Sequence, residues 1–353
     1  LLYFYLSILI YYSVLKYTNL NYIDIQKIIK ISIIFCSFVG LIEIFHIINY
    51  TGFTNQILTF IGKYFTSSTD SLSELNSIYT YGRIKTVSQE ASHYAIYLSF
   101  ALPWILYLTP QKNNEKYIKI ILINLILIMV IFSQSRTAYV ILAIQFFFYF
   151  LLENIWNKFK LFAYLILFSV ILFFLFKNFK INTPYFQGKI DVTQIISSLN
   201  DPDNPSNITR FTSQKSSYDV AAENPFFGVG FGQAGFFIFN YYHKYCKDNY
   251  ELNIYASKND YIFAWPVSHS LYARIAAEVG YPGLILFLLI YIYIIYYSFK
   301  FRNYFEYRTI FISMIGIFLS GFNVDSLRFS FIPFTIAYFL YVKKNKINYS
   351  LNL

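Results

Sequence analysis

The sequence predicts an all-α integral membrane protein, a polytopic helical bundle, and three observations support that prediction. Apolar runs of about 15 to 25 residues alternate with short polar turns, which is typical of membrane-spanning helices. Hydrophobic residues make up 57% of the chain and charged residues 13%. Lysines and arginines cluster in the short turns between the apolar runs. Together these features disfavour a soluble enzyme.

About nine apolar segments are long enough to be candidate membrane spans. They are 1–15, 28–48, 94–108, 117–132, 137–152, 161–176, 271–299, 309–322 and 329–342. Several are shorter than the roughly 20 residues that a perpendicular span needs, so we expect polar residues or a protein interior at their ends. Because the chain begins at Leu1 on a short apolar run, we also expect one or more helices to precede it.

The basic residues of the short turns predict the orientation. If the nine segments alternate in direction, every basic group falls on one face, which we assign to the cytoplasm. These residues are Lys16, Lys27, Lys30, Lys112, Lys116, Lys119, Lys158, Lys160, Lys300, Arg302, Arg308, Lys343, Lys344 and Lys346. The net charge of +10 therefore reports topology rather than nucleic-acid binding. We expect the chemistry on the opposite face, where ATP is absent and synthesis needs a pre-activated donor.

We treat 1–353 as a single polytopic membrane domain with a large extracytoplasmic loop at 177–268. Within this loop, residues 208–222 have the spacing of an amphipathic helix, with Phe211, Tyr218 and Ala222 near one face. We expect this and other short helices in the loop. The chain has only two cysteines, so neither a disulfide framework nor a cysteine zinc site can form.

Arg136 is the first candidate functional residue, because it is the strong cation of a short turn between two apolar segments. An arginine in that position is costly unless it faces water, a lipid headgroup or an anionic ligand. It also departs from the pattern of basic residues on the cytoplasmic face, which favours a function. The alternative is an interfacial arginine that extends to lipid phosphate.

Arg210 and His269 are further candidates, at the start of the amphipathic segment and at the start of the next apolar segment. Neutral imidazole is suited to accepting a proton near neutral pH, although a histidine at a helix start is also a common structural residue. Arg274 and Glu278 are four residues apart and can form an ion pair within one helix. Glu43 and His46 share a helical face, either as a proton pair or as ordinary interfacial residues.

Glycines follow the amphipathic segment, in the run Asn224-Pro-Phe-Phe-Gly-Val-Gly-Phe-Gly. They do not form a nucleotide-binding loop, because no strand precedes them and no Lys-Ser/Thr follows. We expect Gly228 and Gly230 to form a tight turn that lets the backbone approach the membrane or a substrate. A purely structural turn is the alternative.

These motifs, in this order, resemble the O-antigen ligase and polymerase (Wzy/WaaL) superfamily. The resemblance covers about 82–287 and includes Ser135-Arg136, Arg210, Glu223-Asn-Pro-Phe-Phe-Gly-Val-Gly-Phe-Gly and His269-Ser-Leu-Tyr with Glu278-Val-Gly-Tyr-Pro-Gly. It implies a GT-C-type integral membrane glycosyltransferase that polymerises lipid-linked oligosaccharide repeat units into a surface polysaccharide. It also implies a multi-pass protein of the bacterial inner membrane with its active site facing outward.

The resemblance also implies residue roles and partners. Arg136 and Arg210 match arginines that engage the pyrophosphate, and His269 matches a histidine at the reaction centre. The implied partners are an undecaprenyl-pyrophosphate-linked saccharide donor, a saccharide acceptor and membrane lipid, together with a flippase and a chain-length regulator. We expect no cofactor, no metal and no nucleic acid. We place Glu278, Gly228 and Gly230 in substrate binding.

The segment from Gly82 to Ala95 bears on the subtype. It resembles the Arg…Glu-Pro-Ser run of many capsule and exopolysaccharide polymerases, although Ala91 replaces the proline. Arg83 and Glu90 are therefore candidate saccharide or phosphate contacts, with loop charges of no further role as the alternative. A ligase that moves finished glycan to lipid A core or protein uses the same chemistry and stays open. A transporter would show internal repeats, and we find none.

Overall fold

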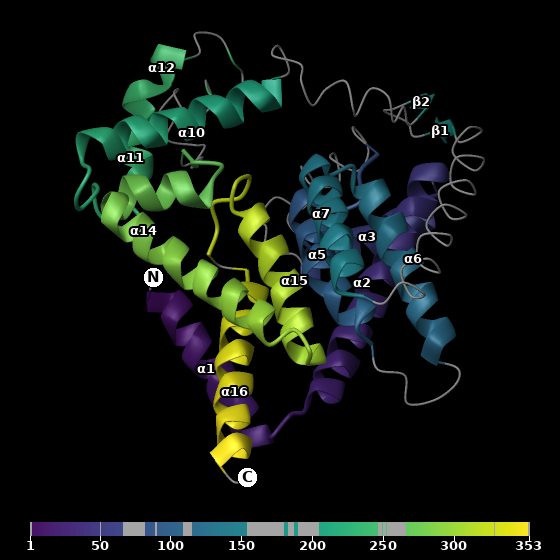
Figure 1. The fold of residues 1–353 in the computed structure, drawn as a ribbon. Helices are drawn as coiled ribbons and strands as arrows, with labels where there is room; N and C mark the ends of the chain where they lie inside the picture. The colour runs from purple at the N-terminus through teal and green to yellow at the C-terminus, as the bar shows by residue number, and fades with distance from the viewer. Residues whose placement is uncertain are drawn as a thin grey trace. The chain divides into compact units, whose positions relative to one another are not determined.

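The computed structural model describes residues 2–49, 51–65, 82–88, 90–108, 115–153, 180–182, 187–189, 205–245, 249, 252, 266–327 and 329–351. Across these ranges the chain is mainly helical (Figure 1). A two-stranded antiparallel hairpin joins β1 (Lys180–Asn182) to β2 (Gln187–Lys189), with Ile181 opposite Gly188. The chain divides into two compact units.

Unit 1 comprises residues 1–18, 196–301 and 317–353, and unit 2 comprises residues 19–195 and 302–316. Both units are therefore built from segments that are far apart in the sequence.

Unit 2 contains α2 (Tyr22–Ile48), α3 (Gly52–Phe65), α5 (Ala91–Leu106), α6 (Glu115–Ser133), α7 (Arg136–Leu152) and the first part of α15 (Phe305–Ser320). Helix α5 is its core, because 94–106 is buried almost without interruption. Helices α2, α6 and α7 all pack against it. The large side chain of Trp104 is fully buried and stacks on Tyr22 of α2.

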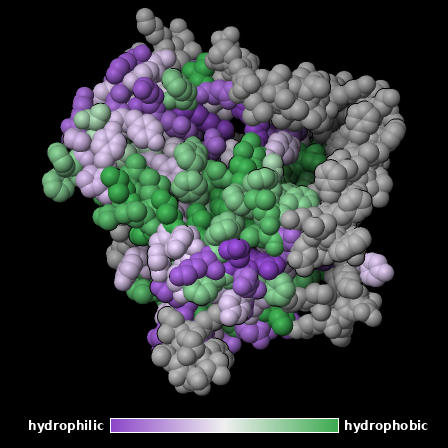
Figure 2. All heavy atoms as spheres, in the orientation of Figure 1, coloured by the Kyte–Doolittle hydropathy of each residue, from purple (hydrophilic) through white to green (hydrophobic). Residues whose placement is uncertain are grey.

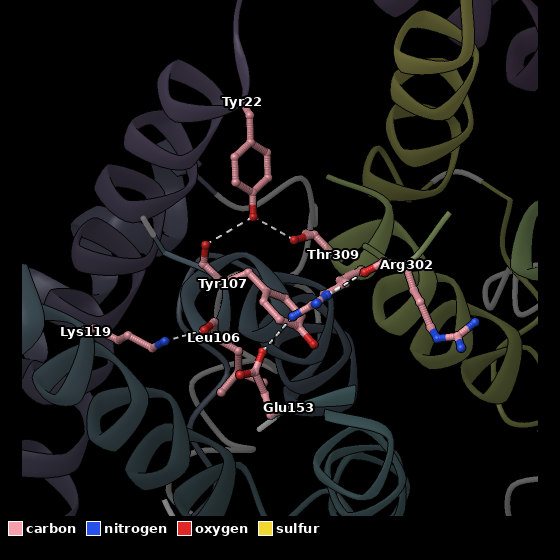
Figure 3. A network of polar contacts seen from close by, with 8 residues as sticks. Tyr22, Leu106, Tyr107, Lys119, Glu153, Arg302 and Thr309 are labelled. Atoms are coloured by element: carbon pink, nitrogen blue, oxygen red, sulfur yellow. Dashed lines mark hydrogen bonds and ion pairs between the residues drawn. The ribbon is translucent and has the colours of Figure 1, made fainter. Parts of the chain in front are cut away.

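A polar network ties the helix ends of unit 2 together (Figure 3). Arg308 Nη1 lies 3.1 Å from Glu153 Oε1, and the Arg308 guanidinium sits over the rings of Tyr107 and Phe305. The Tyr22 hydroxyl lies 2.7 Å from Thr309 Oγ1. Lys119 donates to the carbonyl of Leu106. Lys119 and Arg308, both among the basic residues predicted to face the cytoplasm, therefore also stabilise the fold of unit 2.

Unit 1 contains α1 (Leu2–Thr18), α10 (Pro205–Glu223), α11 (Ala234–Ile238), the 3₁₀ turn η1 (Phe239–Tyr241), α12 (Tyr242–Tyr245), α14 (Leu271–Lys300), α16 (Phe331–Leu351) and the end of α15. Helix α1 packs along α16, and α10 packs on α14. In Figure 1 the first part of α14 runs below α10 before the helix turns sharply.

The bend in α14 lies at Gly280, whose φ of 81° and ψ of 177° are not helical. Pro282 follows, and because proline has no N–H, the carbonyl of Glu278 loses its helical partner. The part before the bend is buried, whereas many apolar side chains after it are exposed.

The buried face of α10 consists mostly of small polar residues. They are Thr209, Thr212, Ser213, Ser216 and Ser217, followed by Val220 and Ala221. Small side chains let two helix backbones approach closely, and the matching part of α14 offers Ala273, Ala276 and Ala277, all fully buried. Phe211 and Tyr218 lie on the exposed side of α10.

By length and composition, two described helices are sufficiently long and apolar to cross a membrane, α2 and α14, and Tyr117–Ser133 and Arg136–Leu152 are shorter apolar helices. Every predicted span except 161–176 coincides with a helix, and 161–176 lies outside the described residues. The total of about nine membrane spans therefore stays a prediction.

The predicted loops contain more structure than expected. Helix α3 lies in the segment 49–93, where no helix was predicted. The helix expected at 208–222 is confirmed as α10, although at 19 residues it is not short. The apolar side chains expected on one of its faces, Phe211 and Tyr218, are exposed. The assignment of 1–353 to a single membrane domain with an extracytoplasmic loop at 177–268 stays a prediction.

Candidate active site

In unit 2, the turn between α6 and α7 carries Arg136. Ser133 ends α6, Gln134 has a positive φ of 49°, and Ser135 is the N-cap residue of α7. Ser135 makes no side-chain capping hydrogen bond, so the first N–H groups of α7 point out of the helix end without that partner. Arg136 is the first residue of the helix, where the macrodipole adds positive potential. This combination favours an anionic ligand.

The segment 82–88 brings Arg83 to the same turn. Arg83 Nε donates to the carbonyl of Ser133 at 3.0 Å, and Gln134 Nε2 donates to the carbonyl of Gly82 at 3.2 Å. The N–H of Ile84 donates to the carbonyl of Phe132 at 3.1 Å. The structure thus joins two predicted arginines, Arg83 and Arg136, that are far apart in the sequence.

A buried carboxylate in α2 holds this segment in place. Glu43 is 1% exposed, and Oε2 accepts the N–H groups of Lys85 at 3.0 Å and of Thr86 at 2.9 Å. Thr86 has a positive φ of 55°, so the backbone there requires support from its neighbours. Glu43 therefore binds backbone, while His46 Nδ1 lies 2.6 Å from Thr54 Oγ1. The proton pair considered for Glu43 and His46 stays a hypothesis, and the structure shows that each of the two groups also has a hydrogen-bond partner of its own.

Glu90 has a different environment. Its side chain is 66% exposed, accepts a hydrogen bond from Ser92 Oγ at 2.9 Å, and lies 3.9 Å from His93 Nε2. It precedes α5 at the N-cap position without capping the helix. The structure therefore places Glu90 at the surface of unit 2, and its role in saccharide binding stays a prediction.

In unit 1, His269 adopts a positive φ of 50°, which is uncommon for a residue with a side chain. Neighbouring hydrogen bonds fix it on both sides. Ser268 N–H donates to Asp325 Oδ2 at 2.9 Å, and Leu271 N–H donates to the carbonyl of Gly321 at 2.8 Å. Ser270 is the N-cap residue of α14. A strained residue that its surroundings hold so firmly is common at functional sites.

Helix α10 links His269 to Arg210. Gln214 Nε2 donates to the carbonyl of His269 at 3.1 Å and to the carbonyl of Phe322 at 3.0 Å. Arg210 lies four residues before Gln214, one turn away on the same face of α10. The structure therefore brings Arg210 and His269, two predicted catalytic residues, to the same end of unit 1. The sequence analysis did not identify Gln214 as a site residue. Its position four residues after Arg210, on the same helical face, was a signal that could have identified it.

The pair predicted within α14 is confirmed. Arg274 Nε donates to Glu278 Oε1 at 2.9 Å, and Arg274 Nη1 donates to the carbonyl of Asp325 at 3.0 Å. The Glu278 side chain is 2% exposed, and its Oε2 has no hydrogen-bond partner among the described residues. Asp325 thus binds two neighbours, because its Oδ2 also accepts the N–H of Ser268.

The glycine run packs against the bend of α14. Val229 N–H donates to the carbonyl of Ala277 at 2.9 Å, and Gly230 N–H donates to the carbonyl of Glu278 at 3.0 Å. A Cβ at Gly228 would lie 2.4 Å from the carbonyl carbon of Glu278. Position 228 therefore requires glycine for two reasons: the backbone of α14 leaves no room for a Cβ, and the φ of 63° disfavours residues with side chains.

Comparison with known proteins bears directly on this arrangement. Residues 121–288 match the family model described as O-Antigen ligase. This segment is an O-antigen ligase domain. The domain belongs to the Wzy/WaaL-like superfamily, whose members are membrane glycosyltransferases that act on lipid-linked glycans. Comparisons with curated proteins and with solved structures gave no match.

The O-antigen ligase domain includes most of the predicted site residues. Arg136, Arg210, Gly228, Gly230, His269 and Glu278 lie inside it, whereas Arg83 and Glu90 precede it. The domain therefore extends from α6 to just beyond the bend of α14. The resemblance predicted from the order of the motifs is confirmed, while the roles of individual residues stay predictions.

Proposed function

We propose that this protein is a polymerase that joins polyprenyl-pyrophosphate-linked oligosaccharide repeat units into a surface polysaccharide at the outer face of the bacterial inner membrane. The observation that supports it most strongly is the hydrogen bond from Gln214, one helical turn from Arg210 on α10, to the backbone carbonyl of His269. It gives one end of unit 1 a cation for the leaving group and an imidazole for the acceptor.

The proposed reaction is a displacement at the anomeric carbon of the donor saccharide. The acceptor hydroxyl attacks that carbon and forms the new glycosidic bond, while the bond to the pyrophosphate oxygen breaks. The hydroxyl proton passes to His269, and polyprenyl pyrophosphate leaves as an anion. Guanidinium groups suit this leaving group, because they donate in a planar fork to phosphate oxygens.

In this proposal Arg136 and Arg83 also bind phosphate or saccharide. Their support is the shared turn at the N-terminus of α7, where two cations and the helix dipole favour an anion. The segment that carries Arg83 resembles the corresponding run of capsule and exopolysaccharide polymerases, which favours the polymerase over the ligase.

The decisive experiment compares surface glycan from a deletion strain with that of the parent strain. Loss of a polymerase leaves surface glycan limited to single repeat units. Loss of a ligase leaves long chains on the carrier lipid and none on the final acceptor, and that result would replace the polymerase by the ligase. Transfer of labelled saccharide by the purified protein with added lipid donor shows whether a glycosidic bond is made.

A further inference from the structure

An aromatic pair stands exposed beside the bend of α14. Phe226 is 71% exposed and Phe227 is 88% exposed, although phenylalanine is among the residues most often buried. Both belong to the segment between α10 and α11 that holds the glycine run. Since the two rings do not pack into unit 1, the fold itself does not account for them.

The position of this pair is fixed relative to α14. Tyr281 N–H donates to the carbonyl of Pro225 at 2.8 Å, and a Cβ at Gly280 would lie 2.6 Å from the carbonyl carbon of Phe226. With the bonds from Val229 and Gly230 to α14, the backbone on both sides of the pair is held at the bend. Phe226 and Phe227 therefore project from a rigid site.

The bend also marks the start of an apolar, largely exposed part of α14. From Tyr281 to Lys300, α14 is apolar and runs for about 20 residues, or about 30 Å at 1.5 Å per residue, which is the thickness of a bilayer's hydrocarbon core. Its exposed side chains include Ile285, Leu286 and Leu289. Hydrophobic residues gather over this part of α14 in Figure 2, whereas hydrophilic residues lie over α10.

We propose that Phe226 and Phe227 insert into the outer leaflet of the membrane beside α14 and anchor the extracytoplasmic segment to the lipid surface. The occupant is bilayer lipid, because the backbone that carries the two rings is held at the bend, where the bilayer-length apolar part of α14 with its exposed side chains begins. Tyr281, itself 38% exposed, lies at the same level, where amphipathic aromatic rings are favoured. The insertion does not depend on which glycosyl transfer the protein performs.

Spin labelling of the full chain in lipid nanodiscs tests this proposal. Cys36 and Cys246 are replaced by serine, and single cysteines are introduced by Phe227→Cys, Leu289→Cys and Lys215→Cys. Leu289 reports the lipid-facing side of α14, and Lys215 is an exposed residue of α10. The measurement compares collision of each label with oxygen, which partitions into lipid, and with a water-soluble nickel chelate.

We expect the label at 227 to favour oxygen, as the label at 289 does, and the label at 215 to favour the nickel chelate. A label at 227 that meets the chelate as freely as the label at 215 overturns the proposal. Low access to both reagents also overturns it, because protein would then cover the site.

A second measurement does not depend on cysteine replacement. Phe227→Trp in the otherwise native chain is compared with Lys215→Trp in bilayers that contain brominated lipid, after subtraction of the signal from the three native tryptophans. Quenching of the residue at 227 and not of the residue at 215 supports insertion. Equal, weak quenching at both positions contradicts it.

Discussion

His269 keeps a left-handed backbone conformation because Ser268, Leu271 and Gln214 bind the groups around it. Such a conformation costs about 1–3 kcal/mol in a residue with a side chain, so the surrounding hydrogen bonds must offset it. The cost is consistent with a position that serves the reaction rather than stability. Arg210 lies on the same face of α10 as Gln214, and in the proposed reaction it binds the leaving pyrophosphate.

Replacing either residue should abolish polymer formation without removing the protein from the membrane. In the proposed reaction, Arg210→Ala removes a cation from the departing pyrophosphate, and His269→Ala removes the proton acceptor. Each loss is expected to lower the transfer rate by about 100-fold or more. The measurement is the rate of transfer from lipid-linked donor together with membrane abundance. Lys215→Ala, an exposed cation of the same helix, is the control, and unchanged polymer length in both variants would refute the site.

Glu43 should matter for the position of Arg83. Glu43→Ala leaves two buried backbone N–H groups unpaired, and each costs about 1–3 kcal/mol. We therefore expect lower thermal stability in detergent and weaker donor binding, with Glu43→Gln intermediate because one amide oxygen can still accept. Asp24→Asn, in the first turn of the same helix and away from the segment 82–88, is the control. If Glu43→Ala unfolds at the temperature of the parent protein, the carboxylate does not hold this segment.

At the scale of elements, the bend of α14 and the glycine run form one unit of structure. The bend frees the carbonyls of Ala277 and Glu278, and the N–H groups of Val229 and Gly230 bind them. The sequence predicted a turn at the glycines and Pro282 indicated a break in the helix. It could not show that these two irregular segments bind each other, because that pairing joins residues about 50 positions apart and has no local signal.

Two glycine variants distinguish the loss of stability caused by a steric clash with α14 from the loss caused by backbone strain alone. Gly228 and Gly232 both have positive φ, but a Cβ at 228 meets the backbone of α14, whereas a Cβ at 232 meets nothing within 4 Å. Gly232→Ala should cost about 1–2 kcal/mol of stability from the left-handed conformation alone. Gly228→Ala should cost clearly more. The midpoint of thermal unfolding measures both, and equal midpoints would mean that the contact with α14 adds nothing.

The apolar helices were the most predictable elements, because length and hydrophobicity alone define them. Helix α10 could be predicted from its spacing, yet its buried face consists of serines and threonines, which hydrophobic periodicity does not identify as buried. Helix α3 was missed for a different reason. It lies in a segment assigned to an extended loop between two spans, and its apolar residues are too few for a span.

At the scale of the whole molecule, the order of motifs predicted the superfamily, whereas the division into two units could not be predicted. Each unit combines distant parts of the chain, and contacts between such parts leave no periodic pattern in a single sequence. The predicted site residues follow this division. Arg83, Glu90 and Arg136 belong to unit 2, and Arg210, Gly228, Gly230, His269 and Glu278 belong to unit 1.

Activity of the intact protein should not depend on a divalent metal. In the proposed reaction guanidinium groups and N–H groups stabilise the pyrophosphate, which is the task that magnesium performs in many phosphate-binding enzymes. Purified protein treated with a chelator should therefore transfer saccharide at the rate of untreated protein. A loss of activity that added magnesium or manganese restores would contradict the mechanism.

The composition of unit 1 has a consequence for the order in which the protein matures during translation. Unit 2 has been synthesised except for 302–316 once residue 195 is made. Unit 1 needs 317–353, including α16, against which α1 packs. Helix α1, although synthesised early, gains that partner only after α16 has been made. Unit 1, which carries Arg210 and His269, is therefore completed after unit 2.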